Sequence, residues 1–260
     1  MGLIRNWRRR RLLQREPLEA TSWQALCDAV PLLACLSAAE RERLRELAAI
    51  FLAEKTLLGV QGQNLEEEQR QLLAALAVLP ILALDSDWYE SFHEVIVYPD
   101  EFIPRHEVED EQGLVHVRHI PLSGESWSHG PVILSWVDVE ASTALDGYNV
   151  VIHEFAHKLD MLNGDANGMP PLHRDMQPAD WTTAFLAAFE QLNADLDAGR
   201  ETLIDPYAAE DPAEFFAVLS EVFFERPGDV QRGYPAVYEQ LRAFYRQDPA
   251  TRMPAAQSSC

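Results

Sequence analysis

The segment His153-Glu154-Phe155-Ala156-His157 constrains this chain more than any other part of its sequence. On an α-helix, four residues turn the chain through about 400°, so His153 and His157 project from one face and can bind one metal ion together. Glu154 lies about 100° away, where its carboxylate can face a water molecule on that metal. The spacing is the HExxH arrangement of zinc-dependent hydrolases. We therefore expect a helix here that carries a catalytic zinc site.

The residues around this motif are apolar. Val150-Val151-Ile152 precede it, and Phe155 and Leu159 share its predicted helix, so we expect the helix to be buried. Ionisable side chains are costly in such surroundings unless they are hydrogen-bonded or bind a metal. A buried helix whose imidazoles are hydrogen-bonded, with no metal, is the alternative interpretation.

A catalytic zinc needs a third protein ligand, with the fourth position left to water. Glu214 is the strongest candidate, because it begins a predicted helix otherwise rich in Phe, Ala, Val and Leu. Glu221 lies two turns later on the same face, so either carboxylate could be the ligand. Alternatively, Glu214 is only a first-turn residue favoured by the helix dipole. Asp160 and Glu221 are further candidates for hydrogen bonds that orient the ligands.

Two more side chains are candidates for contact with a substrate. Tyr207 lies seven residues before Glu214, where a phenol could donate to a developing oxyanion. The alternative is a core tyrosine whose hydroxyl is hydrogen-bonded. His129 precedes a predicted strand, whereas the other histidines outside the motif are interpreted as surface or hydrogen-bonded residues.

The pattern along the chain predicts an α+β fold, with a small β-sheet beside the HExxH helix and an N-terminal helical region. Residues 17–92 have helical spacing of their apolar positions. Strands are predicted at 95–98, 115–120 and 132–136, with a turn at 123–125. Residues 148–152 lead into the helix of the histidine motif, which is expected to stop at Gly164, and further helices are predicted at 181–198, 211–224 and 234–245. The free edge of the strand at 132–136 is expected to pair with an extended peptide. We expect a helical region at 1–92, a catalytic core at 93–247 and a flexible tail at 248–260, forming one compact unit.

The formal net charge of −21, from 42 acidic and 21 basic side chains, argues against binding to nucleic acid phosphates. Cys27, Cys35 and Cys260 show no zinc-binding spacing, and their odd number favours a reducing, cytoplasmic setting. No apolar run suits a secretory signal or a membrane span.

Basic side chains gather at the N-terminus, where six arginines lie within the first fifteen residues. They could form a tag for a membrane surface or an anionic partner. Alternatively, they belong to a solvated end, or to a basic helix docked on the acidic body of the protein. The arginines are Arg5, Arg8, Arg9, Arg10, Arg11 and Arg15.

Three longer segments, at 130–136, 149–160 and 207–218, together resemble the Mlc titration factor A family. These are bacterial cytoplasmic zinc metallopeptidases of the glutamate-zincin type. Their catalytic core is similar to that of anthrax lethal factor, in which a tyrosine also lies seven residues before the glutamate ligand. The resemblance runs over most of the chain and implies a zincin-like core.

The resemblance also implies roles for individual residues. His153, His157 and Glu214 would bind one Zn²⁺ ion, Glu154 would be the general base and Tyr207 would stabilise the oxyanion. The implied activity is hydrolysis of peptide bonds in a peptide or protein substrate, and it is expected to be aminopeptidase-like. The implied partner is an Mlc-like repressor of sugar uptake. The alternatives are a non-catalytic zinc-containing protein that sequesters a transcription regulator, and a hydrolase of non-peptide amides.

Overall fold

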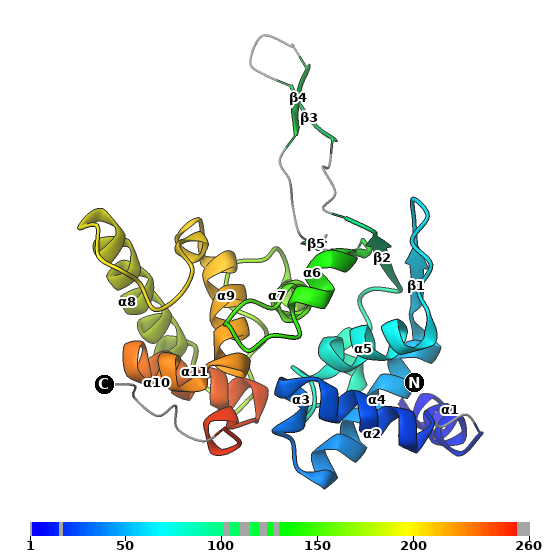
Figure 1. The fold of residues 1–260 in the computed structure, drawn as a ribbon. Coiled ribbons are helices and arrows are strands. Elements are labelled where there is room, and N and C mark those ends of the chain that lie inside the picture. Colours follow the sequence, from blue (N-terminus) through cyan, green and yellow to red (C-terminus); the bar gives the residue numbers. More distant parts are fainter. Residues whose placement is uncertain are drawn as a thin grey trace.

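The computed structural model describes residues 2–15, 18–100, 105–109, 115–119, 124–126 and 130–253 (Figure 1). The α-helices are α1 (Gly2–Arg15), α2 (Ala20–Ala29), α3 (Pro31–Ala34), α4 (Ala38–Glu54), α5 (Glu67–Val78), α6 (Trp136–Ala141), α7 (Val150–Asp160), α8 (Pro178–Asp197), α9 (Pro212–Glu225), α10 (Pro227–Gly233) and α11 (Pro235–Tyr245). The strands are β1 (Thr56–Gly59), β2 (Glu94–Tyr98), β3 (Arg105–Glu109), β4 (Val115–His119), β5 (Gly124–Ser126) and β6 (Val132–Ser135). Four short 3₁₀ helices are η1 (Ser86–Tyr89), η2 (Met161–Asn163), η3 (Pro206–Ala209) and η4 (Pro249–Thr251).

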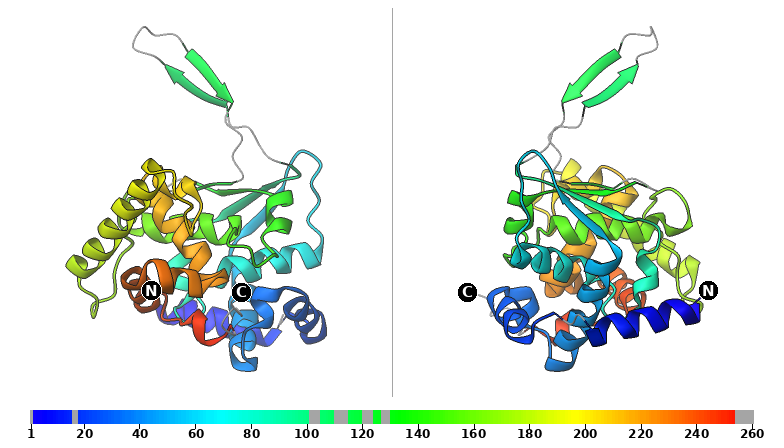
Figure 2. Two further views of the ribbon diagram at one scale, coloured as in Figure 1. Left: turned by 60° about the vertical axis from the view of Figure 1, so that its left-hand side comes forward. Right: turned by 90° about the vertical axis from the view of Figure 1, so that its right-hand side faces the viewer.

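A four-stranded sheet with the order β1-β2-β6-β5 covers the helix that carries the histidine motif. β1, β2 and β6 run parallel, and β5 pairs antiparallel with β6. Val95 of β2 lies opposite Val132 of β6, and Val97 lies opposite Leu134, and all four are buried. Because side chains alternate along a strand, these four buried residues share one face of the sheet. Helices lie against the sheet (Figure 2). β3 and β4 pair separately as an antiparallel hairpin.

The helix α7 is buried between the sheet, α5 and α9. Its Phe155 ring lies 5.7 Å from the ring centroids of Phe51 and Phe92 and 5.1 Å from that of Tyr89. These aromatic contacts fix α7 against the N-terminal region, as expected for rings at edge-to-face separations. The helix that carries the metal motif therefore sits in the hydrophobic core.

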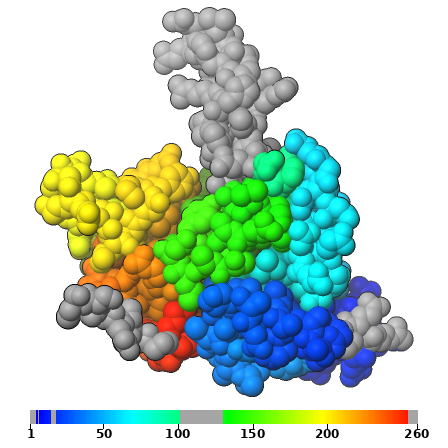
Figure 3. Space-filling model, in the orientation of Figure 1, coloured from blue at the N-terminus to red at the C-terminus, as the bar shows by residue number. Residues whose placement is uncertain are grey.

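The C-terminal helices α8 to α11 pack on the other side of α7. In Figure 3 they lie on the opposite side of the molecule from the N-terminal region, with the green segment after residue 130 between them. The aromatic rings of Phe216 on α9 and Phe244 on α11 lie 6.1 Å apart, and Trp181 of α8 stacks 4.2 Å from Phe185. This packing holds α9 firmly beside α7. The α+β zincin-like fold expected from the sequence is confirmed.

The basic N-terminal segment forms α1, which is docked on acidic side chains. Arg9 is buried and donates through Nε and Nη2 to both oxygens of Glu54, at 2.7 and 2.8 Å, and it also pairs with Asp87. Arg5 forms ion pairs with Asp87 and Glu90. The interpretation of a basic helix docked on the acidic body therefore accounts for these two arginines.

Three strands, β1, β3 and β5, were not expected from the sequence, and two of them, β1 and β5, belong to the four-stranded sheet. Residues 17–92 were predicted to be helical, but β1 lies within this range and pairs with β2, joining the N-terminal region to the sheet. The predicted turn at 123–125 overlaps β5, whose three residues pair with β6. Both strands are too short to show alternation, and both depend on partners distant in the sequence. The prediction that β6 has a free edge is therefore wrong, since β2 and β5 occupy its two edges.

Three other segments differ from the expected elements. The strand predicted at 132–136 ends at Ser135, whose hydroxyl accepts from the Asp138 N–H and begins α6. The short helix α10 lies where only a helix end was expected. Within the predicted tail, Pro249–Thr251 form η4 and Arg252 pairs with Glu40 of α4 at 2.6 Å.

Candidate metal centre

The two histidines of the motif meet on one face of α7. Asn149 begins the helix by accepting a hydrogen bond from the Ile152 N–H at 3.0 Å. The rings of His153 and His157 have centroids 4.8 Å apart, and their Nε2 atoms lie 3.2 Å apart. The helical spacing predicted from the sequence therefore points both imidazoles at one position.

Glu214 joins the histidines from the first turn of α9. The helix begins at Asp211, whose carboxylate accepts from the N–H groups of Ala213 and Glu214 at 2.7 and 3.0 Å. The Glu214 carboxylate lies 2.9 Å from Nε2 of His153 and 3.4 Å from Nε2 of His157. One ligand atom from each of the three residues lies within 4.8 Å of the others. Glu214, rather than Glu221, therefore forms with the two histidines a cluster that is compatible with a metal ion.

The arrangement fits a divalent cation such as zinc. Two imidazole nitrogens and one carboxylate, with room for one more ligand, are the donor set of catalytic zinc sites. The contact of 3.2 Å between the two Nε2 atoms requires either a shared proton or a cation between them. Oε2 of Glu154 is buried and has no hydrogen-bond partner among the described residues, so its capacity to accept a hydrogen bond is unused.

The surroundings of Glu154 suit a general base. Its side chain is only 4% exposed, and burial raises its pKa to about 7, against the opposing charges of His153 and His157. A carboxyl with a pKa near neutral can accept and return a proton at physiological pH. The buried surroundings of Glu154 therefore raise its pKa in the direction that a general base requires.

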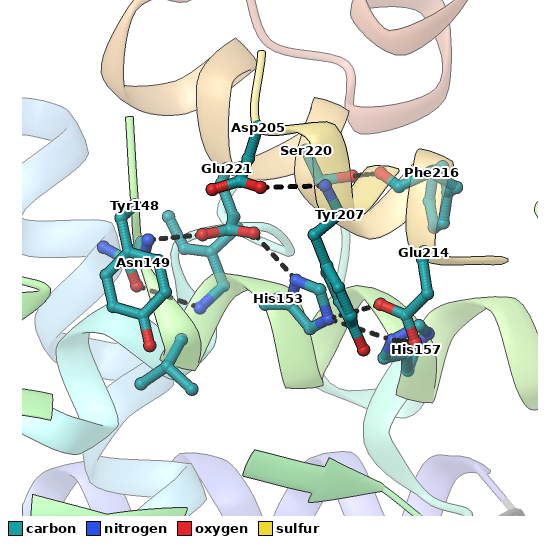
Figure 4. A network of polar contacts seen from close by, with 12 residues as sticks. Tyr148, Asn149, His153, His157, Asp205, Tyr207, Glu214, Phe216, Ser220 and Glu221 are labelled. Carbon is teal, nitrogen blue, oxygen red and sulfur yellow. Dashed lines mark hydrogen bonds and ion pairs between the residues drawn. The ribbon is translucent and has the colours of Figure 1, made fainter. Parts of the chain in front are cut away.

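Tyr207 lies beside the cluster on η3, held by the hydrogen bond from its N–H to Asp205 Oδ1 at 2.8 Å. Its ring centroid is 6.2 Å from that of His153, and its hydroxyl points toward His157 and Glu214 (Figure 4). Partial burial and the charge of Glu214 raise its pKa above the usual value. The phenol therefore stays protonated and can donate a hydrogen bond, and its 43% exposure excludes the core alternative.

Glu221 orients His153 rather than occupying the ligand position. Its Oε1 lies 2.7 Å from Nδ1 of His153, and its Oε2 accepts from the Asn149 N–H at 2.5 Å (Figure 4). Burial opposes protonation of His153, but the hydrogen bonds to Glu214 and Glu221 outweigh it and raise the pKa well above the usual value. The contact also keeps Nε2 directed at the cluster.

Two residues of this network were not anticipated from the sequence. Asn149 donates through Nδ2 to Glu225 Oε1 at 2.8 Å and to the Ser142 carbonyl at 3.0 Å. Glu225 lies one turn after Glu221 on α9. This spacing of four residues places both side chains on one face of the helix and could have indicated Glu225 from the sequence. The amide of Asn149 thus connects the start of α7 to α9.

Asp160 does not have the expected role of orienting a metal ligand. Its Oδ2 accepts from the N–H groups of Asn167 and Gly168, at 2.8 and 2.7 Å. It therefore holds the loop after α7 rather than orienting an imidazole. Among the other histidines, His173 donates to the Phe244 carbonyl at 2.8 Å and is a hydrogen-bonded residue, as predicted. His129 lies outside the described residues.

Comparison with known proteins identifies the family. The model of the family described as glucose-regulated metallo-peptidase M90 matches residues 4–246. The chain belongs to this family. It shares 45% identity over 230 residues with proteins named Mlc titration factor A from Salmonella arizonae and Salmonella typhimurium. These matches cover 86% of the present chain and 90% and 86% of the two relatives.

A third relative with the same name, from Klebsiella pneumoniae, is 43% identical over 226 residues, which are 86% of this chain and 85% of the relative. The resemblance to the Mlc titration factor A family seen in the sequence is confirmed. Among the described residues of this M90 chain, no helix is long and apolar enough to cross a membrane.

Proposed function

We propose that this chain is a zinc-dependent metallopeptidase that hydrolyses peptide bonds, with His153, His157 and Glu214 as the zinc ligands. The observation that carries the proposal is the convergence of two Nε2 atoms and one carboxylate beside a buried, unpartnered Glu154 oxygen. Membership of a metallopeptidase family supports the same reaction class.

The protein's own side chains would divide the reaction between them. When bound, zinc would polarise the peptide carbonyl and lower the pKa of a water molecule. Glu154 would take the proton from the attacking water and pass it to the leaving amine. The hydroxyl of Tyr207 would donate to the oxyanion of the tetrahedral intermediate. Glu221 would hold His153 in the tautomer that presents Nε2 to the cation.

Exchanging Glu154 for Gln tests the proposal, because the amide keeps the shape of the side chain but cannot accept the proton. We expect the Glu154→Gln variant to retain its zinc, measured by metal analysis, and to lose peptide-library cleavage at least about 100-fold. A matched control is Glu190→Gln, an exposed carboxylate on α8, which should leave cleavage unchanged. Cleavage by Glu154→Gln at the parent rate would contradict the assigned base.

The name of the relatives supports a second candidate function, in which the chain binds and sequesters an Mlc-like repressor. In this alternative the zinc is not catalytic. A pull-down with an Mlc-type repressor separates the two functions, because Glu154→Gln should abolish hydrolysis without altering a binding surface. Partner binding by a protein that cleaves no peptide would favour sequestration alone. If binding survives in the variant and cleavage does not, both functions coexist.

Some features of the proposal come from the sequence alone. The family resemblance implies the aminopeptidase-like character and the cytoplasmic location, and the odd number of cysteines favours the same location. We also propose that residues 1–92 and 93–247 act as one unit, because β1 and β2 belong to the same sheet. Cleavage rates on peptides of one sequence, with a free or a blocked N-terminus, would distinguish an aminopeptidase from an endopeptidase.

A further inference from the structure

The N-terminal helix α1 differs in charge from the rest of the molecule. It contains six arginines and no acidic residue, in a chain whose formal net charge is −21. In the right-hand view of Figure 2, α1 lies near the lower edge of the molecule, coloured dark blue. The acidic surface beside it offers ion-pair partners to its arginines, so it matters which of them use these partners.

The arginines divide between two faces of α1. Arg5 and Arg9 point to the body of the protein, where both form ion pairs with carboxylates. Three others are exposed and form no ion pair within the part of the chain that the structure describes: Arg8, Arg10 and Arg11. The inner pairs neutralise the carboxylates next to the helix, and the outer face keeps three uncompensated positive charges.

An exposed tryptophan lies among the outer arginines. Trp7 is 57% exposed, more than any other large apolar side chain that the structure describes. The guanidinium carbon of Arg11 lies 5.2 Å from the centre of the Trp7 ring. At 100° per residue, Trp7 falls between Arg10 and Arg11 around the helix. Leu12 and Leu13 are partly buried on the opposite side. The outer face therefore combines three cations with one large amphipathic ring.

We propose that the outer face of α1, formed by Trp7, Arg8, Arg10 and Arg11, binds the surface of a membrane that contains anionic lipids. Anionic head groups attract arginine, which strengthens binding by about fivefold for each residue near the surface. Tryptophan prefers the level of the head groups, because its ring is apolar and its N–H can form a hydrogen bond. Since one helix face supplies every contact, we expect the binding to be reversible.

The surroundings of α1 favour a lipid surface over a nucleic acid. A helix that enters the major groove has phosphates on both flanks. The flanks of α1 carry the carboxylates that pair with its inner arginines, among them Asp87 and Glu90, and these would lie close to the phosphates. A bilayer touches only the outer face. Contact with its surface also agrees with the described helices, none of which can cross a membrane.

Cosedimentation of the full-length protein with lipid vesicles tests the proposal. Vesicles of equal parts phosphatidylcholine and phosphatidylglycerol are compared with vesicles of phosphatidylcholine alone. At about 0.1 M salt we expect at least about tenfold stronger binding to the anionic vesicles, and about 0.5 M salt should release the protein because it screens the charges. No binding, or equal binding to both vesicles, would overturn the proposal.

Two triple variants with the same net charge locate the binding surface. The first carries Arg8→Gln, Arg10→Gln and Arg11→Gln, and should bind anionic vesicles at least about tenfold more weakly than wild type. The control replaces three exposed arginines outside α1 and should bind as wild type does. Its substitutions are Arg174→Gln, Arg200→Gln and Arg232→Gln. Equal losses in both variants would show that net charge alone governs binding, which would contradict the proposal.

Trp7→Ala tests contact of the ring with the lipid. We expect severalfold weaker binding, with the preference for anionic vesicles retained. The vesicles should also shift the tryptophan fluorescence of wild type to the blue, and the difference from Trp7→Ala isolates this ring. Circular dichroism shows whether each variant keeps its helices. The vesicles also compete with duplex DNA at equal phosphate concentration, and tighter binding to the DNA would overturn the assignment to a membrane.

Discussion

The carboxylate of Glu221 lies 2.7 Å from Nδ1 of His153 and is only 3% exposed. This contact joins α9 to α7. Glu214 of the same helix lies 2.9 Å from the other ring nitrogen of His153, Nε2. A single helix thus supplies both the candidate metal ligand and the residue that orients a second ligand. Since the two glutamates are seven residues apart, two turns of α9 set both distances.

We expect Glu221→Ala to weaken zinc binding about 10–100-fold, because His153 would lose the acceptor that fixes its ring. Competition with a chromogenic chelator measures the affinity. Glu225→Ala is the control, since Glu225 is also buried on α9 but bonds to Asn149 and Gly147 instead of a ligand. Equal losses in both variants would show that Glu221 acts only through packing of the helices.

Removing the phenol hydroxyl tests the part assigned to Tyr207. In Tyr207→Phe we expect kcat to fall about 10²–10³-fold, as for the loss of one oxyanion donor. KM and zinc content should change little, because the ring and the ligands remain. Steady-state kinetics with metal analysis checks this result. A rise in KM at constant kcat would instead indicate that the tyrosine only binds substrate.

The pKa of Glu154 gives a pH dependence. Burial raises this pKa to about 7, and a bound dication would lower it by favouring the carboxylate. The base works only when deprotonated, so kcat/KM should be constant above the pKa and fall as the pH decreases through it. We therefore expect an acid limb at or below pH 7, measured with zinc content checked at each pH. Activity that increases on acidification would contradict this role.

Gly168 tests the close packing of the loop against α9. Its φ is +77°, and an added Cβ would meet the Pro212 carbonyl at 2.3 Å, so we expect Gly168→Ala to cost about 2–4 kcal/mol of unfolding free energy. Gly199→Ala is a matched control, because Gly199 has φ +65° but no atom within 4 Å of the added Cβ. It should cost about 1 kcal/mol. Denaturant unfolding measures both, and equal costs would contradict the contact.

The metal motif could be predicted from the sequence because its information is local. The spacing of His153 and His157 determines a shared helical face, and Asp211 and Pro212 mark the start of the helix that carries Glu214. For Tyr207 and for Glu214, the sequence alone left a functional and a purely structural interpretation open. Choosing between them required the packing of α9 beside α7. The structure favours Glu214 over Glu221 as the proposed ligand, because Glu214 lies at Nε2 of His153 and Glu221 lies at Nδ1.

Other parts could not be predicted, because they depend on contacts between distant segments. β1 and β5 have four and three residues, too few to show a period, and their pairing with β2 and β6 depends on the whole sheet. In the structure Asn149 caps α7 by accepting from the Ile152 N–H. Its further bonds to Ser142 and to α9 appear only when the two helices are packed.

The most direct test of the central claim is zinc analysis of the purified wild type beside Glu214→Ala, with an X-ray anomalous map at the zinc edge. The account predicts one zinc per chain in wild type, located between Nε2 of His153, Nε2 of His157 and the Glu214 carboxylate at distances of about 2.0–2.2 Å. It predicts that Glu214→Ala binds zinc at least about 100-fold more weakly. A zinc bound elsewhere, or unchanged affinity in Glu214→Ala, would contradict it.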